Sequence, residues 1–143
     1  MLFGKRNRIV KRILVVEDEP LTAFDNETML ADAGYEIVAT LDGFDDALEV
    51  IEREVIDLIL SDLRLRSHET GLDIARAAKE RGIPTMFATG HELPAAAEVA
   101  IGCLKKPYSE RQLLAAIDSV DRHLAGEEVT PSKGFVLFVS EQS

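Results

Sequence analysis

The sequence predicts an α/β fold: a doubly wound five-stranded parallel sheet with helices on both faces and a shortened fourth helix. Five short apolar runs alternate along the chain with segments of helical periodicity. The runs are continuous rather than alternating, which is typical of strands buried on both faces of a parallel sheet. Right-handed crossovers between such strands place helices on both faces.

The first strand is predicted at residues 13–16 and the second at residues 37–39. The helix between them begins near Pro20 and ends at Gly34, since glycine commonly ends a helix. A second helix follows, and Asp42 is expected to cap its start. Its apolar side chains fall on one face at helical spacing: Phe44, Ala47, Leu48, Ile51 and Val55.

The third strand is predicted at residues 58–60 and the fourth at residues 86–88. Thr70 and Asp73 form a cap pair for the helix between them. Gly82 ends that helix.

The fourth helix is expected to be short. Little chain separates the fourth strand from a weak fifth strand at 101–104, and Pro94 lies inside that interval. Because proline disrupts a helix interior, we expect only one or two turns around residues 95–98. Ser109 and Gln112 then form a capping box for the last helix.

One domain fits a chain of 143 residues. Residues 12–125 are expected to form it, after a basic lead-in at 1–11 and before a tail at 126–143. The tail turns apolar at 135–139, which indicates an extra strand. That strand could add to an open sheet edge of the same chain or of a partner, so a homodimer through the tail is one alternative.

Composition argues against several functional classes. The formal net charge of −10 repels phosphate backbones, so we expect no nucleic-acid partner. No apolar run approaches the length of a membrane span or a secretory signal, so we expect no membrane partner and a cytoplasmic location. The tail is too short for a helix-turn-helix, which argues against a DNA-binding output.

Polar side chains follow four of the predicted strands. Glu17 and Asp18 follow the first, Asp62 the third, Thr89 the fourth and Lys106 the fifth. Because ligands of such sheets bind at the carboxyl ends of the strands, we expect these groups to lie together. Each acidic residue alone fits a helix cap or a turn, and it is the coincidence of all the positions that favours a site.

Clustered carboxylates repel one another unless a cation or a proton offsets their charge. Hard oxygen ligands suit Mg²⁺, and a lysine with a hydroxyl would hold an anion beside the metal. This combination describes a phosphoryl-transfer site, where positioning and charge neutralisation account for most of the catalysis. An aspartate in such a site can act as the nucleophile and become an acyl phosphate.

These motifs resemble those of response-regulator receiver domains. The sequence ILVVEDEP at residues 13–20 looks like their first strand and acidic pocket. Asp62 matches their phosphoacceptor, Thr89 their switch hydroxyl, and Lys106 their lysine before a cis proline. The match runs from about Arg12 to Leu124 and implies a flavodoxin-like (CheY-like) fold with strand order 2-1-3-4-5.

The resemblance also implies roles for these residues. Asp18 and Asp62 would bind Mg²⁺ directly, together with the backbone carbonyl of Arg64, and Glu17 would act through metal-bound water. Lys106 would pair with the phosphoryl group and Thr89 would hydrogen-bond it. Like other receivers, the chain would catalyse its own aspartyl phosphorylation and dephosphorylation rather than act as a conventional enzyme.

A finer resemblance concerns the sequence PTMFATGH at residues 84–91. It is similar to the Pro-Phe-x-Phe-Ala-Thr-Gly-Tyr motif of the FAT GUY receivers, from which it departs at Thr85 and His91. Members of that group are usually stand-alone receivers in bacterial general stress or light signalling. The implied partners are a sensor histidine kinase and a downstream protein or phosphotransfer protein.

One departure bears on signalling. Many receivers carry an aromatic residue three positions before the lysine, and here that position is Cys103, which is too small to act as a gate. We therefore expect phosphorylation to change the order of residues 90–104 instead of swinging an aromatic side chain.

Three alternatives compete with this interpretation. A receiver-like interaction module that takes no phosphate would use the same fold. Phosphatases and mutases with an aspartate nucleophile place two aspartates, separated by one residue, after the first strand, which Glu17-Asp18-Glu19 does not match. A flavin-binding domain would need a hydroxyl- and glycine-rich loop at that point, which the sequence lacks.

Overall fold

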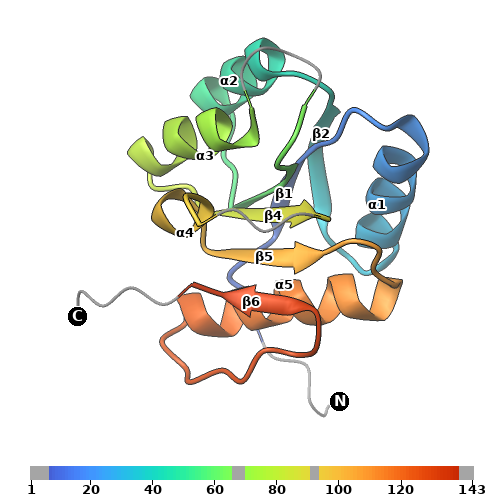
Figure 1. Ribbon diagram of the computed structural model, residues 1–143, viewed down its shortest axis with the longest axis vertical. Helices are drawn as coiled ribbons and strands as arrows, with labels where there is room; N and C mark the ends of the chain where they lie inside the picture. Colours follow the sequence, from blue (N-terminus) through green and yellow to red (C-terminus); the bar gives the residue numbers. More distant parts are fainter. Residues whose placement is uncertain (1–6, 66–69, 91–93, 139–143) are drawn as a thin grey trace.

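A single six-stranded sheet organises the molecule, in the order β2-β1-β3-β4-β5-β6 (Figure 1). The computed structural model describes residues 7–65, 70–90 and 94–138. The first five strands pair in parallel, and β6 pairs antiparallel with β5. The predicted order 2-1-3-4-5 is therefore confirmed, with one strand added. The strands are β1 Arg12–Val16, β2 Glu36–Leu41, β3 Leu58–Asp62, β4 Thr85–Thr89, β5 Gly102–Lys105 and β6 Phe135–Leu137.

Helices cover both faces of the sheet, as predicted. One face packs against α1 and α5, and the other against α2, α3 and α4. Neighbouring residues of β1 point to opposite faces: Ile13 packs with the α1 and α5 side chains, and Leu14 packs with those of α2 and α3. The helices are α1 Pro20–Asp32, α2 Phe44–Arg53, α3 Gly71–Glu80, α4 Ala96–Val99 and α5 Glu110–Leu124.

Local capping signals locate most helix starts. Capping boxes are present at Thr70 with Asp73 and at Ser109 with Gln112, as predicted. The Glu19 side chain caps α1 by accepting from the Leu21 backbone N–H at 2.9 Å. The fourth helix is a single turn of four residues, so its predicted shortness is confirmed.

Two details predicted for the second helix are wrong. Asp42 does not cap it, because Gly43 is the N-cap residue of α2 and makes no side-chain capping bond. Val55 is not on its buried face, because the backbone turns extended at Glu54 on its way to β3, and the Val55 side chain is 70% exposed. The buried stripe consists of Ala47, Val50 and Ile51.

The apolar tail forms a strand on the chain's own sheet edge. Backbone hydrogen bonds join Lys105 N to Gly134 O at 2.8 Å and Phe138 N to Ile101 O at 2.9 Å. Phe135 packs over Gly102, where a Cβ atom would lie 2.6 Å from its ring. The strand was expected at 135–139; it spans 135–137, and residue 139 lies outside the described residues.

Two carboxylates, one of them buried, hold the segment that leads into β1. Val10 is fully buried, and Asp121 of α5, which is 1% exposed, accepts from the backbone N–H groups of Ile9 and Val10 at 2.8 and 2.7 Å. Asp57 accepts from the next two backbone N–H groups, both at 2.9 Å. In the part of the chain that the structure describes, no helix has the length and apolar character of a membrane span.

The Asp121 contacts predict a clear stability effect. Asp121→Ala leaves two backbone donors without their acceptor, and we expect a loss of about 2–4 kcal/mol in the free energy of unfolding, measured by urea denaturation. The matched control is Asp118→Ala, because Asp118 lies on the same helix and pairs with Arg122 at the surface. That change should cost less than about 1 kcal/mol. Equal losses in the two variants would contradict the assignment.

Candidate functional site

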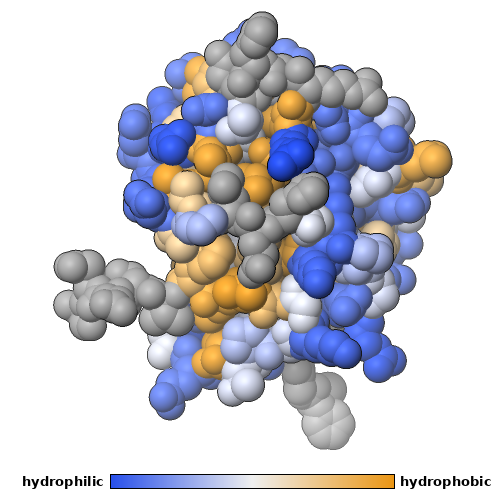
Figure 2. Space-filling view, in the orientation of Figure 1, coloured by the Kyte–Doolittle hydropathy of each residue, from blue (hydrophilic) through white to orange (hydrophobic). Residues whose placement is uncertain are grey.

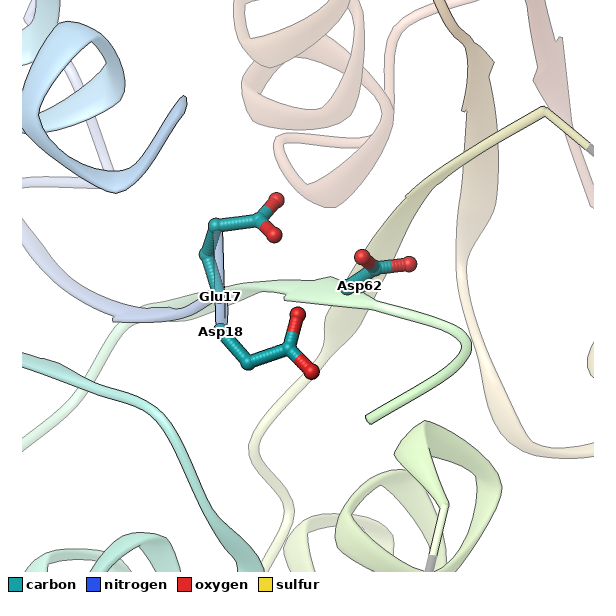
Figure 3. Close-up of side chains that lie close together, drawn as sticks. All are labelled: Glu17, Asp18 and Asp62. Carbon is teal, nitrogen blue, oxygen red and sulfur yellow. The ribbon is translucent and has the colours of Figure 1, made fainter. Parts of the chain in front are cut away.

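Three carboxylates meet at the carboxyl edge of the sheet. Glu17 and Asp18 directly follow β1, and Asp62 is the last residue of β3. The two strands are neighbours, with Val16 paired to Ser61, so their ends bring the acidic groups together. One oxygen of each of the three residues lies within 4.8 Å of the others (Figure 3). The predicted acidic cluster is therefore present in the fold.

Glu17 is the most buried of the three, with 4% of its surface exposed. Burial raises the pKa of its carboxyl group, and this effect outweighs the opposing hydrogen bond from Lys106. The negative charge of Asp62 also raises it. Its Oε2 atom accepts from the Glu19 backbone N–H at 3.1 Å, so the side chain is fixed at both carboxylate oxygens.

Lys106 bridges two of these carboxylates. Its Nζ atom lies 3.0 Å from Glu17 Oε1 and 3.2 Å from Asp62 Oδ2. Burial tends to lower the pKa of the ammonium group, but the two carboxylates outweigh it and the pKa is raised, so the lysine stays charged. The neighbouring Lys105 is exposed and lines a cavity beside the site.

Thr89 ends β4 between the acidic residues and the lysine. It is 4% exposed, and its backbone carbonyl accepts from the Lys106 backbone N–H at 2.9 Å. In the sheet register, Asp62 pairs with Ala88, and Thr89 pairs with Lys105. The structure thus brings the predicted residues of four strand ends to one place.

The turn after β3 is built around Asp62 and a close backbone approach. Asp62 Oδ1 accepts from the Arg64 backbone N–H at 3.2 Å. Gly71, the first residue of α3, donates its N–H to Leu63 O at 2.9 Å. A Cβ atom on Gly71 would lie 2.2 Å from Asp62 O, so only glycine fits. Sequence reasoning missed this residue, because a glycine at a helix start has no distinctive local signal.

A cavity of about 700 Å³ adjoins the site on the α4 face. Figure 2 shows apolar side chains over α4 and the neighbouring strands. Cys103 is half-buried there and packs against a core cluster that contains Phe87. The lining residues are Leu63, Thr89, Gly90, Pro94, Ala96, Ala97, Cys103, Lys105, Gly134, Val136 and Phe138.

The donor set of the site is suited to a hard divalent cation. Glu17, Asp18 and Asp62 offer only carboxylate oxygens, the ligands that Mg²⁺ prefers in proteins. Three carboxylates repel one another, and the single positive charge of Lys106 offsets only part of their negative charge. A bound cation would offset the rest, so the residues fit the metal that the sequence predicts.

Comparisons with known proteins agree with this geometry. The family model described as response regulator receiver domain matches residues 13–118. The transcriptional regulatory protein PdtaR of Mycobacterium tuberculosis is 31% identical over 141 residues, which is 94% of this chain and 67% of PdtaR.

Solved structures show the same fold. A CheY-like receiver domain protein of Methanospirillum hungatei is 25% identical, with a TM-score of 0.74 over 83% of this chain and 99% of that one. The response regulator PhyR of Brucella abortus is 26% identical, with a TM-score of 0.70 over 83% of this chain and 50% of PhyR. From its family match, its fold and its strand-end residues, this chain belongs to the response-regulator receiver family.

Proposed function

We propose that this chain is a phosphoreceiver of a two-component phosphorelay, in which Asp62 accepts a phosphoryl group from a sensor histidine kinase. The observation that carries the proposal is the position of Lys106 Nζ, 3.0 Å from Glu17 and 3.2 Å from Asp62. A cation beside a carboxylate nucleophile is what an incoming phosphoryl group requires.

In this proposal the acidic cluster holds Mg²⁺, which neutralises charge on the phosphoryl oxygens when it is bound. Asp18, Asp62 and the Arg64 carbonyl would be direct ligands, and Glu17 would act through water. The resemblance of the strand ends to receiver motifs supports these roles. The donor chemistry of the three carboxylates supports them independently.

The chain's own residues then have distinct tasks in the transfer. An Asp62 carboxylate oxygen attacks phosphorus, and the P–O bond forms as the P–N bond of the kinase phosphohistidine breaks. The departing imidazole keeps the electron pair of that bond. Lys106 would hold a phosphoryl oxygen by an ion pair, and the Thr89 hydroxyl would donate to another oxygen after transfer.

The output of the phosphorylated chain follows from the added charge of about −1.5 to −2. We propose that it signals in the cytoplasm through a downstream protein or a phosphotransfer protein, or drains phosphate from the kinase. The similarity of residues 84–91 to the FAT GUY motif favours general stress or light signalling. Neither nucleic acid nor a membrane is needed as a partner.

The first prediction of this proposed function concerns the phosphoacceptor. With Mg²⁺ and a small phosphodonor such as phosphoramidate, the natural chain should gain one phosphoryl group by intact mass, and Asp62→Ala should gain none. Asp45→Ala, a change at an exposed acidic residue of α2, is the control and should label normally. Absence of label on the natural chain from several donors would favour the interaction module that takes no phosphate.

The second prediction separates the two adjacent lysines. Lys106→Ala should slow the phosphorylation of Asp62 by about 100-fold, because it removes a preorganised cation from the transferring group. Lys105→Ala should change the rate by less than about twofold, since Lys105 is exposed, whereas the contacts to Glu17 and Asp62 are made by Lys106. Similar rates for the two variants would refute the role given to Lys106.

The third prediction concerns the signal. Phosphorylation should change amide hydrogen exchange in residues 94–104, because this segment joins the strand end that carries Thr89 to the loop that carries Lys106, and its helix α4 is a single turn. Exchange in α2, whose buried residues belong to a different core cluster from those of α4, is the internal reference and should not change. Identical exchange in 94–104 with and without the phosphoryl group would exclude this mode of signalling.

A further inference from the structure

A part-buried hydrogen bond joins α1 to the loop that carries Lys106. The Tyr108 hydroxyl donates to Asn26 Oδ1 at 2.7 Å, across 82 positions of sequence. Asn26 is 2% exposed, and Asn26 and Leu30 are the buried residues of α1. Burying a side-chain amide costs free energy unless it is hydrogen-bonded, and an apolar side chain would fill the position without that cost. The bond therefore needs an explanation beyond core packing.

The loop in question runs from the end of β5 to the start of α5 and has three fixed points. The Lys106 N–H donates to Thr89 O, which fixes the loop to β4. Ser109 caps α5, which fixes its far end. Between them, Tyr108 fixes the loop to α1, the helix that begins at Pro20, two residues after Asp18. The lysine and its acidic partners are thus tied to the same helix.

Two properties of Tyr108 keep its hydroxyl in place as a hydrogen-bond donor to Asn26. Its ring packs against the main core cluster, so its position is set by apolar contacts. Burial raises the pKa of its phenol, so the hydroxyl stays protonated and remains a donor at physiological pH. Lys106, in contrast, carries its charge on a flexible four-carbon stem, so the place of its ammonium group depends on how its backbone is held.

We propose that the hydrogen bond between Tyr108 and Asn26 positions Lys106 between Glu17 and Asp62, which makes Tyr108 a positioning residue for phosphoryl transfer. The inference rests on the proposed function. Tyr108 acts through Lys106, and loosening the loop displaces the ammonium group from the transferring phosphoryl group. Small displacements of this kind lower the rate of phosphoryl transfer strongly, because the reaction depends on the alignment of the reacting and charge-stabilising groups.

The test compares three variants by the maximal rate of phosphorylation with phosphoramidate and Mg²⁺. Tyr108→Phe removes only the hydroxyl. The double variant Asn26→Leu with Tyr108→Phe replaces both partners by apolar groups, which removes the bond without leaving a buried group unsatisfied. Tyr35→Phe is the matched control, because Tyr35 is the chain's other tyrosine, is 7% exposed and lies before β2, at the opposite edge of the sheet.

We expect Tyr108→Phe and the double variant to lower the maximal rate by about 10-fold. The double variant should keep the thermal midpoint of the natural chain, and Tyr35→Phe should keep its rate. If Tyr108→Phe does not fold, the double variant carries the test. A double variant that is folded and transfers at the natural rate overturns the inference.

A second measurement separates positioning from a general structural role. In a Lys106→Ala background, adding Tyr108→Phe should have no further effect on the rate. Both changes act on the same interaction, the contact of the Lys106 ammonium group with the transferring phosphoryl group. An equal fold-change in both backgrounds overturns the inference. If the natural chain takes no phosphoryl group at all, the proposed function fails. If the natural chain is phosphorylated and Tyr108→Phe is phosphorylated at the same rate, only the positioning role of Tyr108 fails.

Discussion

The contact of the Lys106 ammonium group with Glu17 and Asp62 is the interaction on which the rest of the site depends. Three carboxylates within 4.8 Å of one another repel strongly, and one of them is almost fully buried. The lysine offsets part of that repulsion. The two carboxylates in turn raise the pKa of the lysine, so it stays charged. What remains is an excess of negative charge, which favours a divalent cation.

The topology of the sheet makes this contact possible. The strand order reverses at β1, since β2 lies on one side of it and β3 on the other. Such a switch point leaves a crevice at the carboxyl ends of the strands, where connections diverge. Glu17 and Asp18 enter the crevice from β1 and Asp62 from β3, and Lys106 reaches it from beyond β5. Residues 89 positions apart therefore meet within hydrogen-bonding distance.

Features with local causes could be predicted from sequence, and so could the meeting of strand ends that a parallel sheet imposes. Individual contacts between distant segments could not. Continuous apolar runs located the parallel strands, and the two capping boxes located helix starts. Val55 fits the helical spacing but not the path to β3, which only the fold determines. The need for glycine at Gly71 and the Asn26–Tyr108 bond arise from segments far apart in the chain. For the same reason, the tail's apolar run predicted a strand but not the edge it joins.

The central claim is that the carboxylate cluster beside Lys106 holds a divalent cation for phosphoryl transfer. The most direct test is a Mg²⁺ titration followed by ¹H–¹⁵N NMR, comparing the natural chain with Asp18→Asn. Saturable shifts should centre on residues 17–19 and 62–64, with the Mg²⁺ affinity reduced at least about 10-fold in the variant, since a hard cation depends on its carboxylate ligands. Saturable shifts elsewhere, or equal affinity in the two proteins, would contradict the central claim.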